Sequence, residues 1–151
     1  MIVAGVMSGT SADGVNVALV RIAEGSKKLH FNLLGHAEFP YPKQVRRAVL
    51  NAMNASRISV ADLARLNFLL AELYSDAVLA AQKRFRVKAD LIGCHGQTLY
   101  HQGEAKNFLG RKVAVTWQIG EGAILAARLQ APVISDFRPA DMAAGGKGAA
   151  T

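Results

Sequence analysis

The sequence predicts an α/β fold in which a mixed sheet is covered by helices, and three observations support this. The N-terminal part holds three short β-type apolar runs separated by turn-forming residues. A long stretch with helical apolar spacing follows. After it, short apolar runs alternate with a second helical pattern, and this succession is typical of a sheet with helices packed on it.

The three N-terminal strands are expected to form an antiparallel meander. Ile2–Met7 and Gly14–Ile22 are apolar runs, and Ser8–Asp13 between them is rich in turn formers, so the two runs predict a hairpin. Lys28–Phe39 is the third expected strand.

Two helices are expected next. Pro42 suits the first turn of a helix, and an apolar stripe follows it. Ser59 is a good N-cap for a second helix that runs to about Arg84, with Asp62 in its first turn. The stripe of this second helix predicts core packing and consists of Leu63, Leu66, Leu70, Leu73 and Ala77.

The remaining elements alternate between strands and a helix. Asp90–Cys94, Lys112–Trp117 and Pro132–Phe137 are expected strands, and Gly122–Leu129 is an expected helix. The strand and helix order βββ-α-β-α-β is that of the ribonuclease H-like fold. We therefore expect one domain of this type, large enough to bury a real core.

Bulk properties exclude several classes of protein. The chain has 151 residues, of which 51% are hydrophobic, and its longest apolar runs fall far short of a membrane helix. Cys94 is the single cysteine, which excludes an intramolecular disulfide, and the N-terminus lacks a secretory pattern. We expect a cytoplasmic location. The net charge of +7 comes from scattered basic residues, so nucleic-acid binding is disfavoured; a steep salt dependence of binding would be needed to revive it.

The first candidate site is the loop Ser8–Gly14. Gly9 and Gly14 allow backbone N–H groups to approach a ligand, and successive N–H groups in a turn make an anion cradle. Asp13 could hold Mg²⁺ through water. The same residues also suit a plain hairpin turn, and the Lys-Ser/Thr ending of a Walker A loop is absent.

The second candidate is His95-Gly96-Gln97-Thr98, expected as a loop after a buried strand. Ligands gather at the carboxyl ends of strands in open α/β sheets, and these side chains offer the hydrogen bonds that a sugar needs. A buried, satisfied histidine is the competing interpretation.

The third candidate is the segment from Ser135 to Asp141. Asp136 and Asp141 follow an apolar run together with Arg138, and one of the two acids could be a general base. A turn-capping Asp136 with a paired Arg138 is the alternative. Cys94 is interpreted as a small buried residue because nothing near it in sequence activates it.

Together these segments resemble the anhydro-N-acetylmuramic acid kinases, which are sugar kinases of the actin and hexokinase type. The matching stretches are GVMSGTSADGVNVALV (Gly5–Val20), DLIGCHGQT (Asp90–Thr98), WQIGEGAILAAR (Trp117–Arg128) and PVISDFRPADMAAGG (Pro132–Gly146). Four motifs in order at family-like spacing cover nearly the whole chain.

The resemblance implies an ATP-dependent kinase that opens 1,6-anhydro-N-acetylmuramic acid and forms N-acetylmuramic acid 6-phosphate in peptidoglycan recycling. It implies Asp141 as the catalytic base, with Mg²⁺ as cofactor. The residues at the sugar would be His95, Gln97, Thr98, Asp136 and Arg138. The residues of the ATP-phosphate loop would be Gly9, Thr10, Ser11, Ala12, Asp13, Gly14, Val15 and Asn16.

The resemblance also sets expectations for domain organisation. Residues 1–137 would be the phosphate- and sugar-binding lobe, and residues 138–151 the start of a truncated second lobe. We expect such a fragment to be inactive alone, with a homodimer possible. Asn16, Lys147 and Ala150 depart from the usual family residues. A truncated, non-catalytic relative that binds sugar or phosphate, or pairs with another chain, is the alternative.

Overall fold

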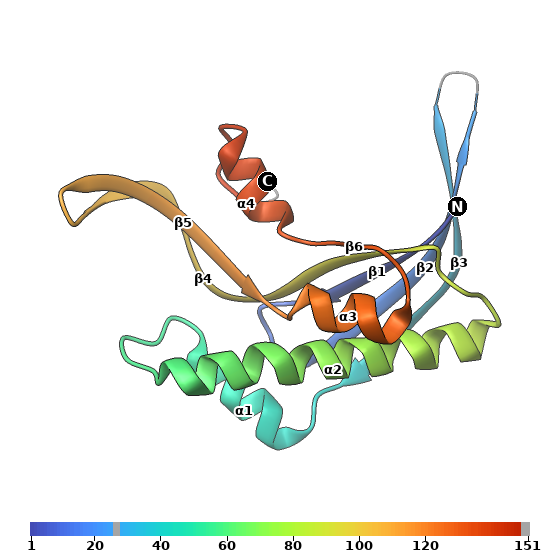
Figure 1. The fold of residues 1–151 in the computed structure, drawn as a ribbon, viewed down its shortest axis with the longest axis horizontal. Helices are drawn as coiled ribbons and strands as arrows, with labels where there is room; N and C mark the ends of the chain where they lie inside the picture. The colour runs from blue at the N-terminus through green and yellow to red at the C-terminus, as the bar shows by residue number, and fades with distance from the viewer. Residues whose placement is uncertain (26–27, 149–151) are drawn as a thin grey trace.

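The computed structural model describes residues 1–25 and 28–148, and within them a six-stranded sheet forms the centre of the fold (Figure 1). The strand order is β3-β2-β1-β4-β5, with β6 paired to β4. β1 lies antiparallel to β2 but parallel to β4, and β4 is parallel to β6. The strands are β1 (Ile2–Ser8), β2 (Gly14–Glu24), β3 (Leu29–Pro40), β4 (Leu91–Phe108), β5 (Arg111–Ile119) and β6 (Val133–Ile134).

This arrangement confirms the predicted ribonuclease H-like mixed sheet. Its first three strands form the expected antiparallel meander, and the strand after the long helix returns beside β1. The parallel pairing of β1 and β4 brings the end of β1 close to the middle of β4, so that Ser8 lies opposite Gln97.

The described residues form four helices: α2 and α3 lie side by side on one face of the sheet, α1 packs against α2, and α4 lies on the other side of the sheet, where it contacts β5 (Figure 1). Their bounds are α1 (Lys43–Ala52), α2 (Val60–Phe85), α3 (Gly122–Leu129) and α4 (Phe137–Ala143). None of the helices among residues 1–25 and 28–148 is long and apolar enough to cross a membrane.

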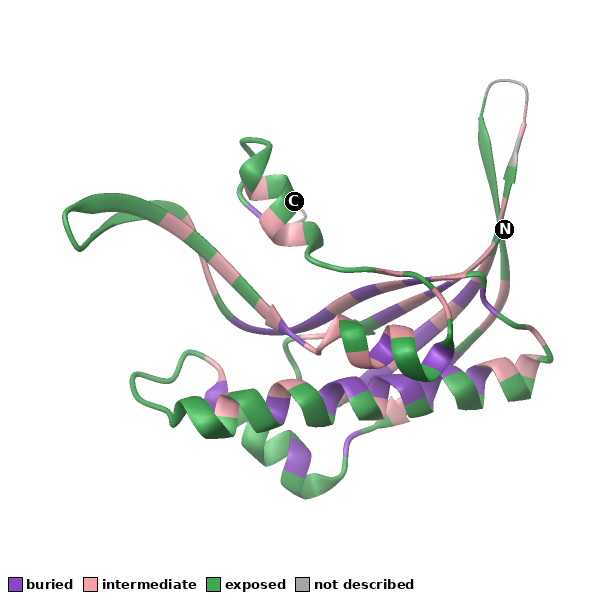
Figure 2. Cartoon of the chain, in the orientation of Figure 1, coloured by how far each residue is buried: buried purple, intermediate pink, exposed green. Residues whose placement is uncertain are grey.

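The predicted leucine stripe of α2 packs into the core. Ser59 caps the helix by accepting a hydrogen bond from the Asp62 backbone N–H, as expected. Leu66 and Leu70 are buried against the sheet, and Figure 2 shows the buried side of α2 facing the strands. A fully buried leucine contributes roughly 1.5–3 kcal/mol, so this face anchors the helix.

Two predicted strands differ from the structure. β4 does not end at Cys94 but continues to Phe108, so the expected His95–Thr98 loop is part of a strand. The strand expected at Pro132–Phe137 is only Val133–Ile134, because Asp136 adopts a left-handed backbone conformation and α4 begins at the next residue. Pro139 fits in the first turn of α4, where its missing N–H costs no hydrogen bond.

Candidate functional site

The Ser8–Gly14 segment joins β1 to β2 as a non-helical hairpin connection, as predicted. The Ala12 N–H donates to the Gly9 carbonyl at 3.1 Å and closes a turn within it. Thr10, Ser11 and Asp13 are exposed, whereas Ala12 is buried against the core. The loop therefore presents hydroxyl groups and a carboxylate to solvent while its base is anchored.

The end of the predicted phosphate-binding segment lies in β2. Val15 is buried in the core, and Asn16 is half-buried with its Oδ1 atom 3.1 Å from Nε2 of His36. Asn16 is thus linked to β3, which pairs with β2 along its whole length.

Asp13 is held by a basic neighbour from α1. The Arg46 guanidinium donates to Asp13 Oδ1 and to the Ser11 carbonyl, and the closest nitrogen lies 3.0 Å from the carboxylate oxygen. In the described part of the chain, no group of three or more His, Cys, Asp or Glu side chains is arranged to hold a metal ion. A lone carboxylate suits a water-mediated contact to Mg²⁺ carried by a nucleotide better than direct coordination.

A bulge in β4 separates His95 from Gln97. The pairing with β1 passes from Val6–Cys94 to Met7–Gly96, so one extra residue lies in β4, and Gly96 has a φ of 75°. Such a bulge reverses the alternation of side chains. His95 consequently contacts α4, whereas Gln97 enters the buried interior beside the Ser8–Gly14 loop.

A chain of hydrogen bonds connects His95 to Asp141. Arg138 donates from Nε to His95 Nε2 at 2.8 Å and from its terminal nitrogen to the Gly148 carbonyl at 3.2 Å. The Gly148 N–H in turn donates to the Asp141 carboxylate at 2.9 Å. Because Arg138 can only donate, His95 Nε2 is the acceptor, and its Nδ1 carries the proton that faces the Gly96 carbonyl at 2.9 Å.

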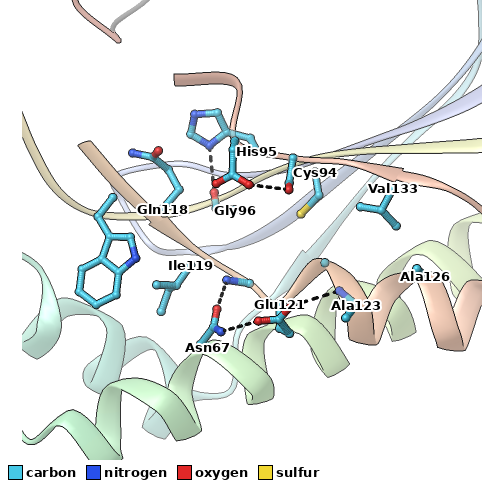
Figure 3. A pocket seen from close by; sticks show the side chains of 15 residues that line it. Asn67, Cys94, His95, Gly96, Gln118, Ile119, Glu121, Ala123, Ala126 and Val133 are labelled. Atoms are coloured by element: carbon cyan, nitrogen blue, oxygen red, sulfur yellow. Dashed lines mark hydrogen bonds between the residues drawn. The ribbon is translucent and has the colours of Figure 1, made fainter. Parts of the chain in front are cut away.

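A cavity of about 510 Å³ opens between β4, β5, α2 and α3 (Figure 3). His95 and Asp136 are the two predicted sugar-site residues among those that line it, and Asp136 accepts a hydrogen bond from Ser135 Oγ at 2.8 Å. Gln97 and Thr98 are buried and do not line it, and neither Arg138 nor Asp141 does. The full lining is Asn67, Cys94, His95, Gly96, Trp117, Gln118, Ile119, Gly120, Glu121, Gly122, Ala123, Ala126, Val133, Ser135 and Asp136.

Sequence reasoning missed the polar end of this cavity. The Asn67 amide accepts from the Gly120 N–H at 2.7 Å and donates to Glu121 at 3.2 Å, while Glu121 also accepts from the Ala123 N–H. Figure 3 shows this cluster at the end of the cavity opposite His95. Glu121 lies in the family-like stretch Trp117–Arg128 but was not singled out within it, and Asn67 is a half-buried residue beside the core-facing leucines of α2 and carries no signal of its own.

Gln118 and Cys94 also line the cavity, but neither side chain is in a reactive state. The Gln118 amide nitrogen donates to Thr116 and Thr98, while its oxygen is buried without a hydrogen-bond partner among the described residues. Burial raises the pKa of the Cys94 thiol to about 11. The thiol is therefore neutral near pH 7, which supports the interpretation of Cys94 as a buried structural residue.

The geometry defines a ribonuclease H-like α/β lobe with an anchored hairpin loop and a polar cavity. A family profile described as anhydro-N-acetylmuramic acid kinase matches residues 1–151. The chain belongs to this family.

Curated relatives agree with this assignment, and each is an anhydro-N-acetylmuramic acid kinase. The chain is 40% identical over 151 residues to that of Caldanaerobacter subterraneus subsp. tengcongensis, with 98% of this chain and 38% of the relative covered. It is 38% identical over 149 residues to that of Prochlorococcus marinus, with 99% and 38% covered. It is 41% identical over 150 residues to that of Salinibacter ruber, with 97% and 38% covered.

The chain thus spans about 38% of the length of these relatives. Among solved structures, the Thermus thermophilus RuvC structure is similar with a TM-score of 0.45 at 19% identity, and the match covers 100% of this chain and 74% of that chain. Family membership follows from the sequence matches.

Proposed function

We propose that this chain provides the phosphate- and sugar-binding lobe of a kinase that converts 1,6-anhydro-N-acetylmuramic acid to N-acetylmuramic acid 6-phosphate at the expense of ATP. The observation that carries the proposal is the hydrogen-bonded path from His95 through Arg138 and Gly148 to Asp141. It ties the cavity-lining strand β4 to the acid that we assign as general base.

In this reaction, water attacks the anomeric carbon while the Asp141 carboxylate accepts its proton. The bond from that carbon to O6 breaks, O6 attacks the γ-phosphorus of ATP, and ADP leaves. Attack at an anomeric carbon passes through an oxocarbenium-like state and needs a positioned carboxylate. The Gly148 N–H donates to one carboxylate oxygen at 2.9 Å and so restricts the rotation of the Asp141 side chain.

The sugar would occupy the cavity and extend past His95 toward α4, so that the water at its anomeric carbon can reach Asp141, which does not itself line the cavity. His95 at one end and the Asn67–Glu121 pair at the other offer donors and acceptors for hydroxyl and acetamido groups. Asp136 would orient a sugar hydroxyl. Thr98 and Arg138 would hold two cavity-lining side chains in place through hydrogen bonds, Thr98 to Gln118 and Arg138 to His95.

The ATP phosphates would bind at the segment from Gly9 to Asn16, whose start is a Gly- and hydroxyl-rich hairpin connection. Phosphoryl transfer needs mainly alignment and neutralisation of charge, which Mg²⁺ bound to ATP supplies. Asp13 would contact that ion through water after releasing Arg46, and Arg46 would then face the phosphates.

The domain division, the location and the assembly state belong to the same proposal. Residues 1–137 are assigned to this lobe and residues 138–151 to the start of a second lobe, of which 149–151 lie outside the described residues. We place the protein in the cytoplasm, where peptidoglycan fragments are recycled, and a homodimer is compatible with this role. The competing proposal is a non-catalytic relative that binds sugar or phosphate or pairs with another chain.

A coupled assay tests the proposal. The purified chain is mixed with MgATP and the anhydro sugar, ADP release is followed, and the product is weighed by mass spectrometry, with a full-length relative as positive control. ADP release that requires the sugar, with a product equal to sugar plus water plus a phosphoryl group, supports catalysis by the chain. Sugar binding without ADP release is the result that an isolated lobe and a non-catalytic relative both predict, and binding of neither ligand overturns the proposal.

A further inference from the structure

The Gln97 side chain has surroundings unlike those of its neighbour His95. It is 0% exposed, and it does not line the sugar cavity. The bulge at Gly96 turns it toward the start of the Ser8–Gly14 loop, where Ser8 pairs with Gln97 across the parallel strands. A buried amide in this position must satisfy its donor and acceptor groups within the protein.

Both ends of the Gln97 amide bind the first residues of the loop. The oxygen Oε1 lies 2.6 Å from Ser8 Oγ, and the nitrogen Nε2 donates to the Gly9 carbonyl at 3.2 Å. Nε2 also lies within 3.4 Å of the Thr98 carbonyl. The Gln97 side chain therefore binds the hydroxyl of Ser8 and the carbonyl of Gly9, two successive residues at the point where β1 ends and the loop begins.

Ser8 and Tyr41 extend this contact to the other end of the loop. Ser8 Oγ lies 3.0 Å from the Gly14 carbonyl, so its single proton is shared between Gly14 and Gln97. The Tyr41 hydroxyl donates to Ser8 Oγ at 2.9 Å, and the Tyr41 N–H donates to the Asp13 carbonyl at 2.9 Å. The two ends of the loop thus meet in one buried hydrogen-bond network.

We propose that Gln97 is a positioning residue that fixes the Ser8–Gly14 loop relative to the sugar-binding strand, and that it does not contact the sugar. Hydrogen bonds in a buried network depend on one another, because loss of one partner leaves the others unsatisfied in a low-dielectric interior. Gln97 is separated from the cavity-lining His95 only by Gly96. The same short segment of β4 therefore holds both the Ser8–Gly14 loop and the cavity-lining His95.

The test uses amide hydrogen exchange and MgATP titration of the whole chain. Gln97→Met keeps side-chain length but removes the hydrogen bonds to Ser8 and Gly9, and Gln97→Glu keeps the acceptor for Ser8 but removes the donor to Gly9. Ser8→Ala removes the partner from the loop side. Ser75→Ala is the matched control, because Ser75 is equally buried but, among the residues that the structure describes, its hydroxyl bonds only to the Ala71 carbonyl within α2.

We expect Gln97→Met and Ser8→Ala to speed exchange of the loop amides about tenfold while the central α2 amides keep their protection, the scale of one net hydrogen bond. Gln97→Glu should give the same local effect, and Ser75→Ala should leave loop exchange unchanged. Affinity for the anhydro sugar should stay within about twofold, since a side chain outside the cavity makes no contact with it.

Loss of sugar affinity in Gln97→Met with unchanged loop exchange would show that Gln97 is a sugar ligand and would overturn the inference. If Gln97→Met does not fold, the Ser8→Ala and Gln97→Glu variants decide by the same exchange readout. The MgATP titration rests on the proposed function, and in that titration Gln97→Met should weaken MgATP binding about tenfold. Absence of MgATP binding by the unmodified chain would refute the proposed function, while the exchange data would still report on Gln97.

Discussion

At the scale of single residues, the two acids of the DFR-x-x-D segment have different environments. Asp136 precedes α4 in a left-handed backbone conformation and lines the cavity, where it accepts from Ser135. Asp141 lies within α4, outside the cavity lining, and its carboxylate accepts from the Gly148 N–H. The assignment of Asp141 as the base and of Asp136 as the orienting residue therefore stays a proposal that rests on the family resemblance.

We therefore expect Asp141→Asn to lower kcat by about 10²–10⁴-fold with substrate affinity nearly kept, since general bases contribute on that order. The Asn side chain keeps the shape and an acceptor for the Gly148 N–H, so the fold should be preserved. The measurement is steady-state kinetics of both Asp→Asn changes, made at the matching positions of a full-length relative. Near-normal turnover for Asp141→Asn with collapse for Asp136→Asn would exchange the two roles.

The single cysteine gives a second prediction at this scale. Cys94 is 1% exposed and its pKa is raised to about 11 by burial. At pH 8 only about one thiol in 10³ is then ionised, and the thiolate is the reactive form. We expect Ellman's reagent to label the native protein at least about 10²-fold more slowly than the chain in guanidinium. Equal rates in the two conditions would show that Cys94 is accessible and activated.

At the scale of elements, a helix or strand is predictable from the sequence when the residues that determine it lie within the element itself. The Ser59 cap and the leucine spacing of α2 lie within one segment, so the sequence was enough to place that helix. The continuation of β4 depends on the Gly96 bulge and on pairing with β5, where Gln97 lies opposite Ile119. The local sequence pattern does not reveal pairing between distant strands, and this is why the prediction of a loop at His95–Thr98 is wrong.

The loop between β1 and β2 offers a matched pair of glycine substitutions. A Cβ atom at Gly14 would lie 2.2 Å from the Phe39 carbonyl oxygen, whereas the nearest atom to one at Gly9 is Ser11 Oγ at 3.8 Å. We expect Gly14→Ala to destabilise the fold by about 1–3 kcal/mol, as overpacking against backbone does. Gly9→Ala should change stability by less than about 0.5 kcal/mol.

If phosphates approach the loop backbone, Gly9→Ala should still weaken MgATP binding, because its methyl group would occupy that approach. Denaturant unfolding and nucleotide titration of both variants measure the two effects separately. Unchanged MgATP affinity in a stable Gly9→Ala protein would remove Gly9 from the phosphate site.

At the scale of the whole molecule, the sheet topology assembles groups that are distant in sequence. The candidate motifs were visible in the sequence because each carries unusual Gly, His or Asp residues, and the structure places His95 and Asp136 at one cavity. Asn67 and Glu121 were not connected in advance, since 54 positions separate them and only the packing of α2 against the start of α3 joins them. The burial of Gln97 was equally invisible, because it depends on a bulge in a strand.

The central claim is that one lobe binds ATP phosphates and the anhydro sugar at adjoining but distinct places. The most direct measurement is an amide chemical-shift titration of the labelled chain with MgATP, with the sugar, and with both. The account predicts that MgATP shifts the amides of residues 9–16, that the sugar shifts those of Gly96, Gly120 and Glu121, and that both sets respond when the ligands are added together. Competition of the two ligands for one set of amides, or a sugar response confined to other parts of the chain, would contradict it.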